Sequence, residues 1–183
     1  MPPLEAKTSA SDWLIWQLAD SAFPAGGFAH SGGVEATRQQ HELRGRDHLI
    51  EFLEAALAQA GRSSLPFVSV AFDAANDFAW TDHLCDAFTT NHVTNRASRL
   101  QGHAFLASCE RAFCRDAITA LRTEVDGQEL PGHFAPVFGA ICHALHLERG
   151  AALRLFLFNQ LRSWLSSAVR LGIVGPIDAQ TIQ

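Results

Sequence analysis

The spacing of apolar residues constrains the fold of this chain more than any other feature of its sequence. Stretches that alternate apolar and polar residues, which mark half-buried β-strands, are missing, whereas apolar residues three or four positions apart recur throughout. Within 47–60, one stripe comprises Leu49, Phe52, Leu53, Ala56, Leu57 and Ala60. The pattern predicts an all-α fold, a bundle of about eight to ten helices in a single domain over residues 1–183.

Capping and breaking residues set the expected bounds of the helices. We expect helices over 11–20, 34–43, 47–60, 64–75, 81–90, 95–114, 115–124, 134–146 and 149–171. Gly61 is expected to end the third helix, and the segment after Pro176 is expected to be frayed or truncated. The helix over 149–171 is apolar on two sides in its first half, which favours the centre of the bundle over an oligomer contact.

Charge and composition argue against several kinds of partner. The 14 Lys and Arg residues are scattered and the net charge is −5, so nucleic acid is not an expected partner. No stretch approaches the roughly 18 apolar residues of a membrane span, and the N-terminus lacks the pattern of a secretory signal. The four cysteines form no CxxC pair. We therefore expect a cytoplasmic protein with reduced thiols and no membrane contact.

The glycine-rich segment 21–33 invites two catalytic interpretations, and neither matches its pattern. A nucleotide-binding loop needs Lys and then Ser or Thr directly after its last glycine, and this segment lacks both. A serine hydrolase using Ser31 and His30 would need a glycine two positions before the serine, where Ala29 stands. The favoured interpretation is that His30 and Ser31 cap the helix that follows, so we expect no enzyme activity.

Nine histidines prompt a search for a metal site. Cys142 and His146 lie four apart on one expected helix, with His143 between them and His133 just before it. That spacing would place two ligands on one helical face. Cys142 also falls on the apolar stripe of this helix, where a buried cysteine behaves as a small apolar residue. The core interpretation is favoured, no tightly bound cofactor is expected, and the four residues remain weak metal candidates.

Residues 18–35, LADSAFPAGGFAHSGGVE, resemble the N-terminal signature of the UreF family of urease accessory proteins, approximately L-x-D-S-x-F-P-x-G-x-F-x-H-S-x-G-L-E. Gly27 and Val34 depart mildly from that pattern. Three more blocks resemble the family and follow in its order. They are NRASRLQG at 95–102, GHFAPVFG at 132–139, and RLGIVG at 170–175 followed by Gln180.

The resemblance implies an all-helical homodimer that binds other proteins and catalyses no reaction. Such proteins bridge an accessory protein of the D or H type and a nickel-carrying GTPase of the G type. The assembly docks on apo-urease and helps to deliver nickel, which the complex handles. The residues that would contact partners are Phe23, Pro24, Gly26, Gly27, Phe28, His30, Ser31, Glu35, Arg170, Gly172, Gly175 and Gln180. The residues that would suit a dimer contact are Leu155, Phe158 and Arg162.

One departure from the family concerns the end of the sequence. Family members continue past the last block into a tail that contributes to accessory-partner binding, whereas this sequence stops at Gln183. The sequence therefore supports the D-type contact less than the others. Two functions stay open at this point: a scaffold for nickel insertion, and a nickel-binding metallochaperone that uses the four metal candidates directly.

Overall fold

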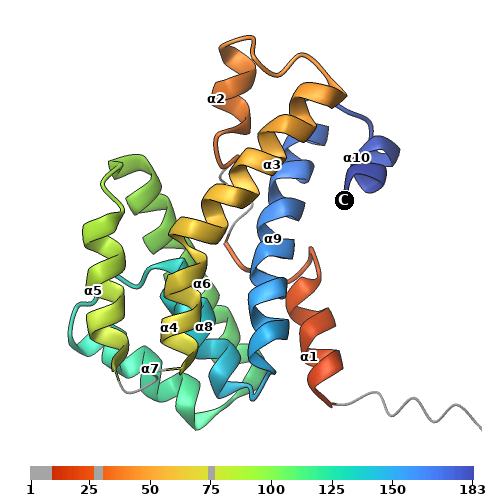
Figure 1. Cartoon of the computed structure of the whole chain (residues 1–183). Helices are drawn as coiled ribbons and strands as arrows, with labels where there is room; N and C mark the ends of the chain where they lie inside the picture. Colours follow the sequence, from red (N-terminus) through yellow and green to blue (C-terminus); the bar gives the residue numbers. More distant parts are fainter. Residues whose placement is uncertain (1–9, 27–30, 74–76) are drawn as a thin grey trace, which may run out of the picture.

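The computed structural model describes residues 10–26, 31–73 and 77–183, which form ten α-helices and no strand (Figure 1). The helices are α1 (Ala10–Ala19), α2 (Val34–Gln39), α3 (Arg46–Ser63), α4 (Leu65–Asp73), α5 (Phe78–Phe88), α6 (His92–Phe113), α7 (Asp116–Gly127), α8 (Phe134–Ala144), α9 (Arg149–Arg170) and α10 (Pro176–Ile182). The predicted all-α class is confirmed. None of the helices described is long and apolar enough to cross a membrane.

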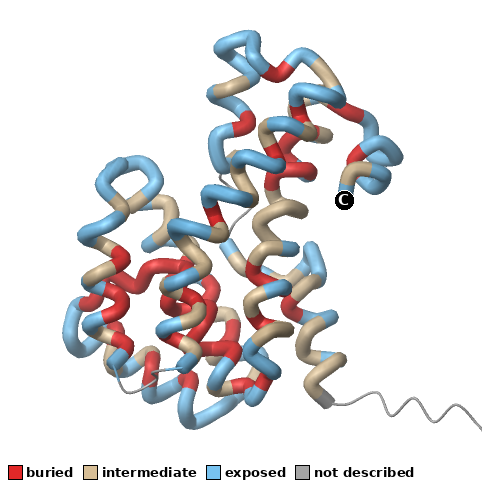
Figure 2. The backbone as a smooth tube through the Cα atoms, viewed as in Figure 1, coloured by how far each residue is buried: buried red, intermediate tan, exposed pale blue. Residues whose placement is uncertain are grey.

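The centre of the fold is α8. Every residue from Leu130 to Cys142 is buried, and this helix lies between α4 and α6 (Figure 2). The helix predicted to hold the centre, α9, packs against six other helices, but it is less deeply buried than α8 and exposes Arg154, Phe158 and Ser166 to solvent. Helix α8 can be enclosed on all sides because it carries no Asp, Glu, Lys or Arg, and burying a charged side chain without a partner is costly.

Two glycines let α8 and the turn before it approach their neighbours at backbone distance. A side chain at Gly139 of α8 would overlap the carbonyl oxygen of Val68 in α4. A side chain at Gly102 of α6 would overlap the carbonyl oxygen of Gly132, just before α8. In both places the obstacle is backbone, which cannot rotate aside as a side chain can.

The buried residues form two apolar clusters that share α9. The first cluster gathers α8 with its neighbours, and phenylalanines 105, 134, 138 and 156 pack on one another within it at ring-centroid distances of 5.4–5.8 Å. The second joins α2, α3, α9 and α10 around Leu49, Leu53 and Trp164. Leu157 of α9 packs against both clusters. In Figure 1, α3 and α9 lie alongside each other, and α1 runs beside the first half of α9.

Replacing Trp164 by alanine is expected to lower the free energy of unfolding by roughly 3–5 kcal/mol. The indole is 8% exposed and packs within the second cluster, so its removal takes apolar contacts away from that cluster and leaves space behind. Equilibrium unfolding in urea measures the loss. Trp16, which is 56% exposed on α1, gives a matched control, and Trp16→Ala is expected to change stability little. Equal effects of the two substitutions would contradict the assignment of Trp164 to the core.

The boundary between α3 and α4 differs from the prediction for a physical reason. Gly61 does not end the third helix, which continues to Ser63. The interruption falls at Ser64 because Pro66 has no N–H to donate to the carbonyl four residues before it. Helix α7 likewise runs three residues further than predicted, to Gly127, and α2 ends at Gln39 rather than at residue 43.

The segment after Pro176 is helical, so the prediction that it frays is wrong. Helix α10 begins at a proline, buries Ala179 and packs on α9 through the second cluster. The turn between the two helices uses Gly172 at φ +67°. The N–H of Ile173 bonds the carbonyl of Ala168, and the N–H of Gly172 bonds that of Val169, which is a Schellman ending.

The stability contributed by the start of α9 is expected to depend on pH. Glu148 caps this helix, and its two carboxylate oxygens accept from the N–H groups of Gly150 at 2.7 Å and Ala151 at 2.6 Å. These bonds hold the pKa of Glu148 below its ordinary value of 4.5. Because the pKa of Glu148 is lower in the folded state, the stability that this cap contributes is present above the unfolded-state pKa. It is lost as the pH falls through the folded-state pKa. The stability difference between wild type and Glu148→Gln should therefore shrink in urea titrations from pH 6 to pH 3, and a constant difference would contradict it.

Candidate partner-binding groove

A groove of about 1180 Å³ opens between the two apolar clusters. One wall comes from α3 and α4, and the other from the end of α5 and the first half of α6. Helix α9 lies along its length, and the turn segments 21–26 and 32–33 close one side. The groove is larger than the 300–1,000 Å³, roughly, of small-molecule pockets, and it is partly open to solvent.

The α9 side of the groove carries short polar side chains. They recur on one face of the helix at Asn159, Gln160, Ser163, Ser166 and Ser167. From Phe156 to Arg170 the groove follows α9 for about 21 Å, taking 1.5 Å of rise per residue. Small hydroxyl and amide groups let another backbone approach closely and still find hydrogen-bond partners.

The segment 18–26 is fixed between α9 and α6. Asn159 donates to the carbonyl of Leu18 at 3.3 Å, and Ser108 of α6 donates to the carbonyl of Pro24 at 2.8 Å. Phe23 packs its ring against those of Phe105 and Phe113, with both centroids 6.0 Å away. Phe23 therefore anchors the segment in the protein's own core.

The structure brings some of the proposed partner-binding residues together and separates others. Phe23, Pro24, Gly26 and Arg170 line the groove. Those that do not line it are Ser31, Glu35, Gly172, Gly175 and Gln180. Gly27, Phe28 and His30 lie outside the described residues. The N-cap of α2 is Gly33 rather than Ser31, although Ser31 Oγ does accept from the N–H of Glu35 in the first turn at 3.3 Å.

The three residues proposed for a dimer contact do not share one surface. Leu155 is only 4% exposed and belongs to the first cluster, so it has no side-chain surface to offer a second protomer. Phe158 is 38% exposed, and the Arg162 guanidinium lies 6.0 Å from its ring centroid. Arg162 also donates to the carbonyl of Ala19, and burial lowers its pKa. This correction leaves Phe158 and the edge of Arg162 as the accessible part of the proposed contact.

The four metal candidates are not gathered into a site. Helix α8 ends at Ala144, so the four-residue spacing of Cys142 and His146 does not fall on one helical face. Cys142 is fully buried, and burial raises the pKa of its thiol. His143 and His146 are exposed, and His133 is buried elsewhere. Across the described ranges, no group of three or more His, Cys, Asp or Glu side chains is placed to hold a metal ion.

A buried polar network fixes the turn that leads into α8. The carboxylate of Asp82, which is 0% exposed, accepts from the N–H groups of Gly132 at 2.6 Å and His133 at 2.8 Å. Burial raises the pKa of Asp82, and the two N–H donors oppose that effect. The network thus joins α5 to the turn at residues 130–133. The carbonyl oxygen of Pro131 in the same turn lies 3.1 Å from His103 Nε2 of α6.

The imidazole of His133 connects three helices. Its Nε2 lies 3.0 Å from Asp86 of α5, and its Nδ1 lies 3.0 Å from the hydroxyl of Ser98 in α6. Asn95 also donates to Asp86 at 2.8 Å, and the bonds from Asn95 and His133 lower the pKa of that carboxyl. Ser98, His133 and Asp86 occur in the order of a hydrolase triad, but the ring is reversed relative to one, since Nδ1 faces the serine and Nε2 faces the carboxylate. Ser98 Oγ also accepts from the N–H of Phe134, so the hydroxyl connects α6 to α8.

This network explains why two separate sequence blocks carry the resemblance. Ser98 and Gly102 from the block at 95–102 meet His133 and Gly132 from the block at 132–139, and Asn95 is linked to His133 through their shared partner Asp86. Sequence reasoning missed Asp82 and Asp86. Spacing could have found the first, since Phe78, Asp82 and Cys85 occupy one helical stripe and all three are buried.

Comparison with known proteins gives concordant similarities. The family model described as UreF matches residues 43–183. Urease accessory protein F of Oryza sativa subsp. indica is 35% identical over 175 residues, which cover 93% of this chain and 67% of that protein. Urease accessory protein F of Arabidopsis thaliana is 34% identical over 180 residues, covering 96% and 75%. Urease accessory protein UreF of Haemophilus influenzae (strain PittEE) is 27% identical over 175 residues, covering 92% and 74%.

Proposed function

The chain belongs to the UreF family of urease accessory proteins, and from this membership we propose that it is a non-catalytic scaffold that bridges other maturation factors to apo-urease during nickel insertion. Its role in urease maturation rests on the family match over residues 43–183, which is the observation that carries the proposal. The proposed partners are an accessory protein of the D or H type, a nickel-carrying GTPase of the G type and apo-urease. Nickel would be held by the complex and pass to the urease site as cargo.

The arrangement of the described residues supports a function in protein binding. The fold presents an open groove beside α9, and side chains of Phe, Trp and Arg, the types enriched in interface centres, line it. The contacts of Ser98, His133 and Asp86 connect α5, α6 and the start of α8, which supports a structural role for these three residues. We propose that the chain binds its partners through surfaces that include this groove, and that a homodimer contact includes Phe158 and Arg162.

Co-elution tests this function directly. The chain would be produced together with a tagged D-type protein and the G-type GTPase from the same source, and the mixture run on gel filtration. We expect one co-eluting complex that contains all three proteins. Elution of this chain alone from both partners would sink the scaffold proposal. Equilibrium dialysis against nickel would then decide for a direct carrier if one equivalent bound and His143→Ala with His146→Ala abolished the binding.

A further inference from the structure

A second, smaller hollow lies on the side of α6 that points away from the groove. Its volume is about 400 Å³. The residues that line it, and that define what we call the α6 hollow, are Asn95, Arg96, Arg99, Leu100 and His103. At 3.6 residues per turn they fall within an arc of about 140° around the helix axis. The α6 residues that line the groove, among them Thr94, Ser98 and Gln101, fall on the opposite arc, so α6 presents two separate surfaces.

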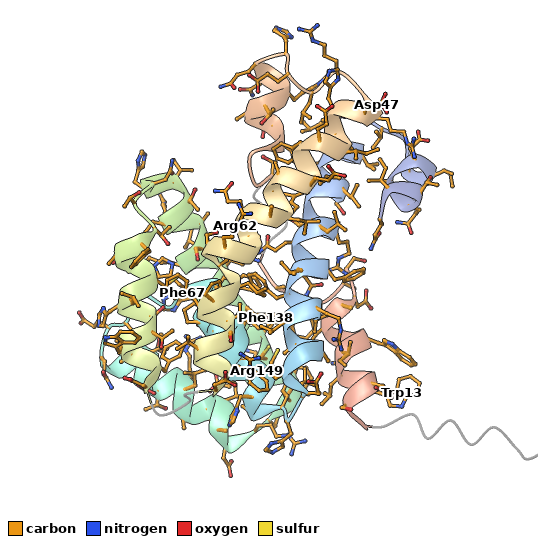
Figure 3. The ribbon with its side chains drawn as sticks, viewed as in Figure 1. Trp13, Asp47, Arg62, Phe67, Phe138 and Arg149 are labelled. Atoms are coloured by element: carbon orange, nitrogen blue, oxygen red, sulfur yellow. The ribbon has the colours of Figure 1, made fainter. Side chains whose placement is uncertain are left out.

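The side of α6 between these two surfaces is buried. Phe105 stacks on Phe138 of α8, which is labelled inside the bundle in Figure 3, with the ring centroids 5.5 Å apart. The α6 hollow instead faces solvent. Leu100, one of its lining residues, is 56% exposed, and Val93, seven residues earlier on the same side of the helix, is 62% exposed. A ligand would therefore meet aliphatic surface as well as charge.

The α6 hollow is positively charged and has no carboxylate among its lining residues. Arg96, Arg99 and His103 follow one another at steps of three and four residues, and residues 92–109 of α6 contain no Asp or Glu. Like charges at this spacing on a helix repel one another, so the two arginines do not stabilise α6. The chain as a whole carries a net charge of −5, so a positive surface on it selects for a negatively charged ligand.

The two arginines are available to a ligand in different ways. Arg96 is exposed, and its side chain makes no hydrogen bond or ion pair within the part of the chain that the structure describes. Arg99 donates from Nε to the carbonyl of Pro131 at 3.3 Å, which uses one of its five N–H donors and holds the guanidinium in place. The hollow thus combines one unengaged guanidinium with a second that is fixed beside it.

One carboxylate outside the hollow lies near enough to Arg99 to respond to its charge. It belongs to Asp86, whose pKa is lowered chiefly by bonds from Asn95 and His133 and further by the charge of Arg99. Asp86 Oδ1 accepts from Asn95 at 2.8 Å and lies 3.0 Å from His133 Nε2. No ion pair joins Asp86 to Arg99 among the described residues. Asp86 therefore belongs to the buried network and leaves the Nη groups of Arg99 unpaired.

We propose that the α6 hollow receives an acidic segment of a partner protein, an inference that rests on the scaffold function and names the chemistry of one contact. Carboxylates of that segment pair with Arg96 and Arg99, since a guanidinium presents parallel N–H donors that match a carboxylate. Side chains three residues apart on a helix are separated by about 5–6 Å at Cβ, so two carboxylates one turn apart on a partner helix have the matching spacing. An aliphatic side chain of the same segment packs on Leu100, a contact that a free inorganic anion cannot make.

A designed peptide tests this chemistry on the full chain. The probe is a fluorescein-labelled helical peptide of about 14 residues that carries two Glu residues four apart with Leu beside them. Its control carries Gln at both Glu positions. In fluorescence anisotropy at low salt, the Glu peptide is expected to bind at least about tenfold more tightly than the Gln peptide. Equal affinities, or no binding of the Glu peptide, would overturn the proposal.

A single charge reversal locates the contact. Arg96→Glu is expected to weaken binding of the Glu peptide at least about tenfold, and it removes no described internal bond, so the variant should fold. Arg111→Glu is the matched control, because Arg111 is exposed on the same helix and lies outside the hollow, so affinity should be retained. Arg96→Gln, which removes the charge without reversing it, should give a smaller loss. Circular dichroism checks that each variant is folded.

Inorganic phosphate distinguishes a protein segment from a free anion. Leu100→Ser should weaken binding of the Glu peptide, because the aliphatic contact is lost, and an excess of phosphate over chloride at equal ionic strength should leave the peptide bound to the wild type. If phosphate displaced the peptide and Leu100→Ser left its affinity unchanged, the hollow would be a small-anion site and the proposal would be wrong.

The two proposals fail separately. Undiminished peptide binding by Arg96→Glu overturns the assignment of the hollow even if the wild-type chain co-elutes with the accessory proteins. Failure of wild-type co-elution counts against the scaffold function even if the peptide binds as expected. In the three-protein mixture, loss of co-elution in Arg96→Glu with retention in Arg111→Glu supports both.

Discussion

Replacing Gly102 by valine is expected to lower the free energy of unfolding by more than about 3 kcal/mol. The Cβ of any residue at this position would overlap the carbonyl oxygen of Gly132, and it would also lie 2.8 Å from the carbonyl carbon of His133 and 2.9 Å from the Phe134 nitrogen. All three atoms are backbone, and the Asp82 carboxylate fixes the turn that holds them. Relief would require α6 to move away from α8, which would open the first cluster.

Gly61 supplies the matched control for this substitution. It lies inside α3, and a Cβ built there meets nothing within 4 Å. Gly61→Ala should therefore raise stability by about 0.5–1 kcal/mol, because alanine loses less backbone entropy than glycine when a helix forms. Urea titrations of Gly102→Val, Gly102→Ala and Gly61→Ala measure the expected losses and the expected gain in the free energy of unfolding. A Gly102→Val variant as stable as wild type would mean that α6 and α8 are further apart than described.

Replacing Asp82 by alanine is expected to lower the free energy of unfolding by about 3 kcal/mol, since the buried N–H groups of Gly132 and His133 would each lose their acceptor. The structural change should extend beyond α5, because the turn that Asp82 fixes also positions His133 against Ser98 and Asp86. Chemical denaturation gives the loss, and histidine ring resonances in NMR spectra report whether His133 keeps its environment.

The pH dependence of an Asp82→Asn variant separates hydrogen bonding from charge. Burial raises the pKa of Asp82 above its ordinary 3.8, so the carboxyl favours the folded state most below that value and loses this contribution as pH rises through the raised pKa. Asparagine keeps one acceptor and does not titrate. Wild type should therefore gain stability relative to Asp82→Asn as the pH falls from 7 to 4. If the difference in stability between wild type and Asp82→Asn instead narrowed as the pH fell, the two N–H donors would stabilise the carboxylate more than burial destabilises it.

Helical periodicity predicted the class and most of the elements, because an apolar stripe of period 3.6 is a property of each segment alone. The place of each helix in the bundle depends on comparison between segments. Helix α9 has the longer stripe, but α8 has no charged Asp, Glu, Lys or Arg to keep any side in water. Counting those residues, rather than apolar ones, would have identified the most deeply buried helix.

The candidate site was only partly accessible from the sequence. The resemblance pointed to Phe23, Pro24, Gly26 and Arg170, which the fold brings to the groove. Arg62 and Phe88 belong to no quoted block, and they reach the same groove because α3 and α5 face each other across it. The failure of the Cys142–His146 pairing has a local cause, since the helix ends two residues before His146, which adopts φ +57°.

Because α9 supplies side chains to both apolar clusters, the two halves of the molecule share their main support. Unfolding of either cluster would expose the apolar side chains that α9 contributes to it, and unfolding of α9 would remove packing partners from both clusters. Amide hydrogen exchange in α9 should therefore be limited by global unfolding, and thermal denaturation should follow one cooperative transition. A ligand that fills the groove beside α9 would then slow amide hydrogen exchange in both α3 and α8, so binding at one surface would stabilise both clusters.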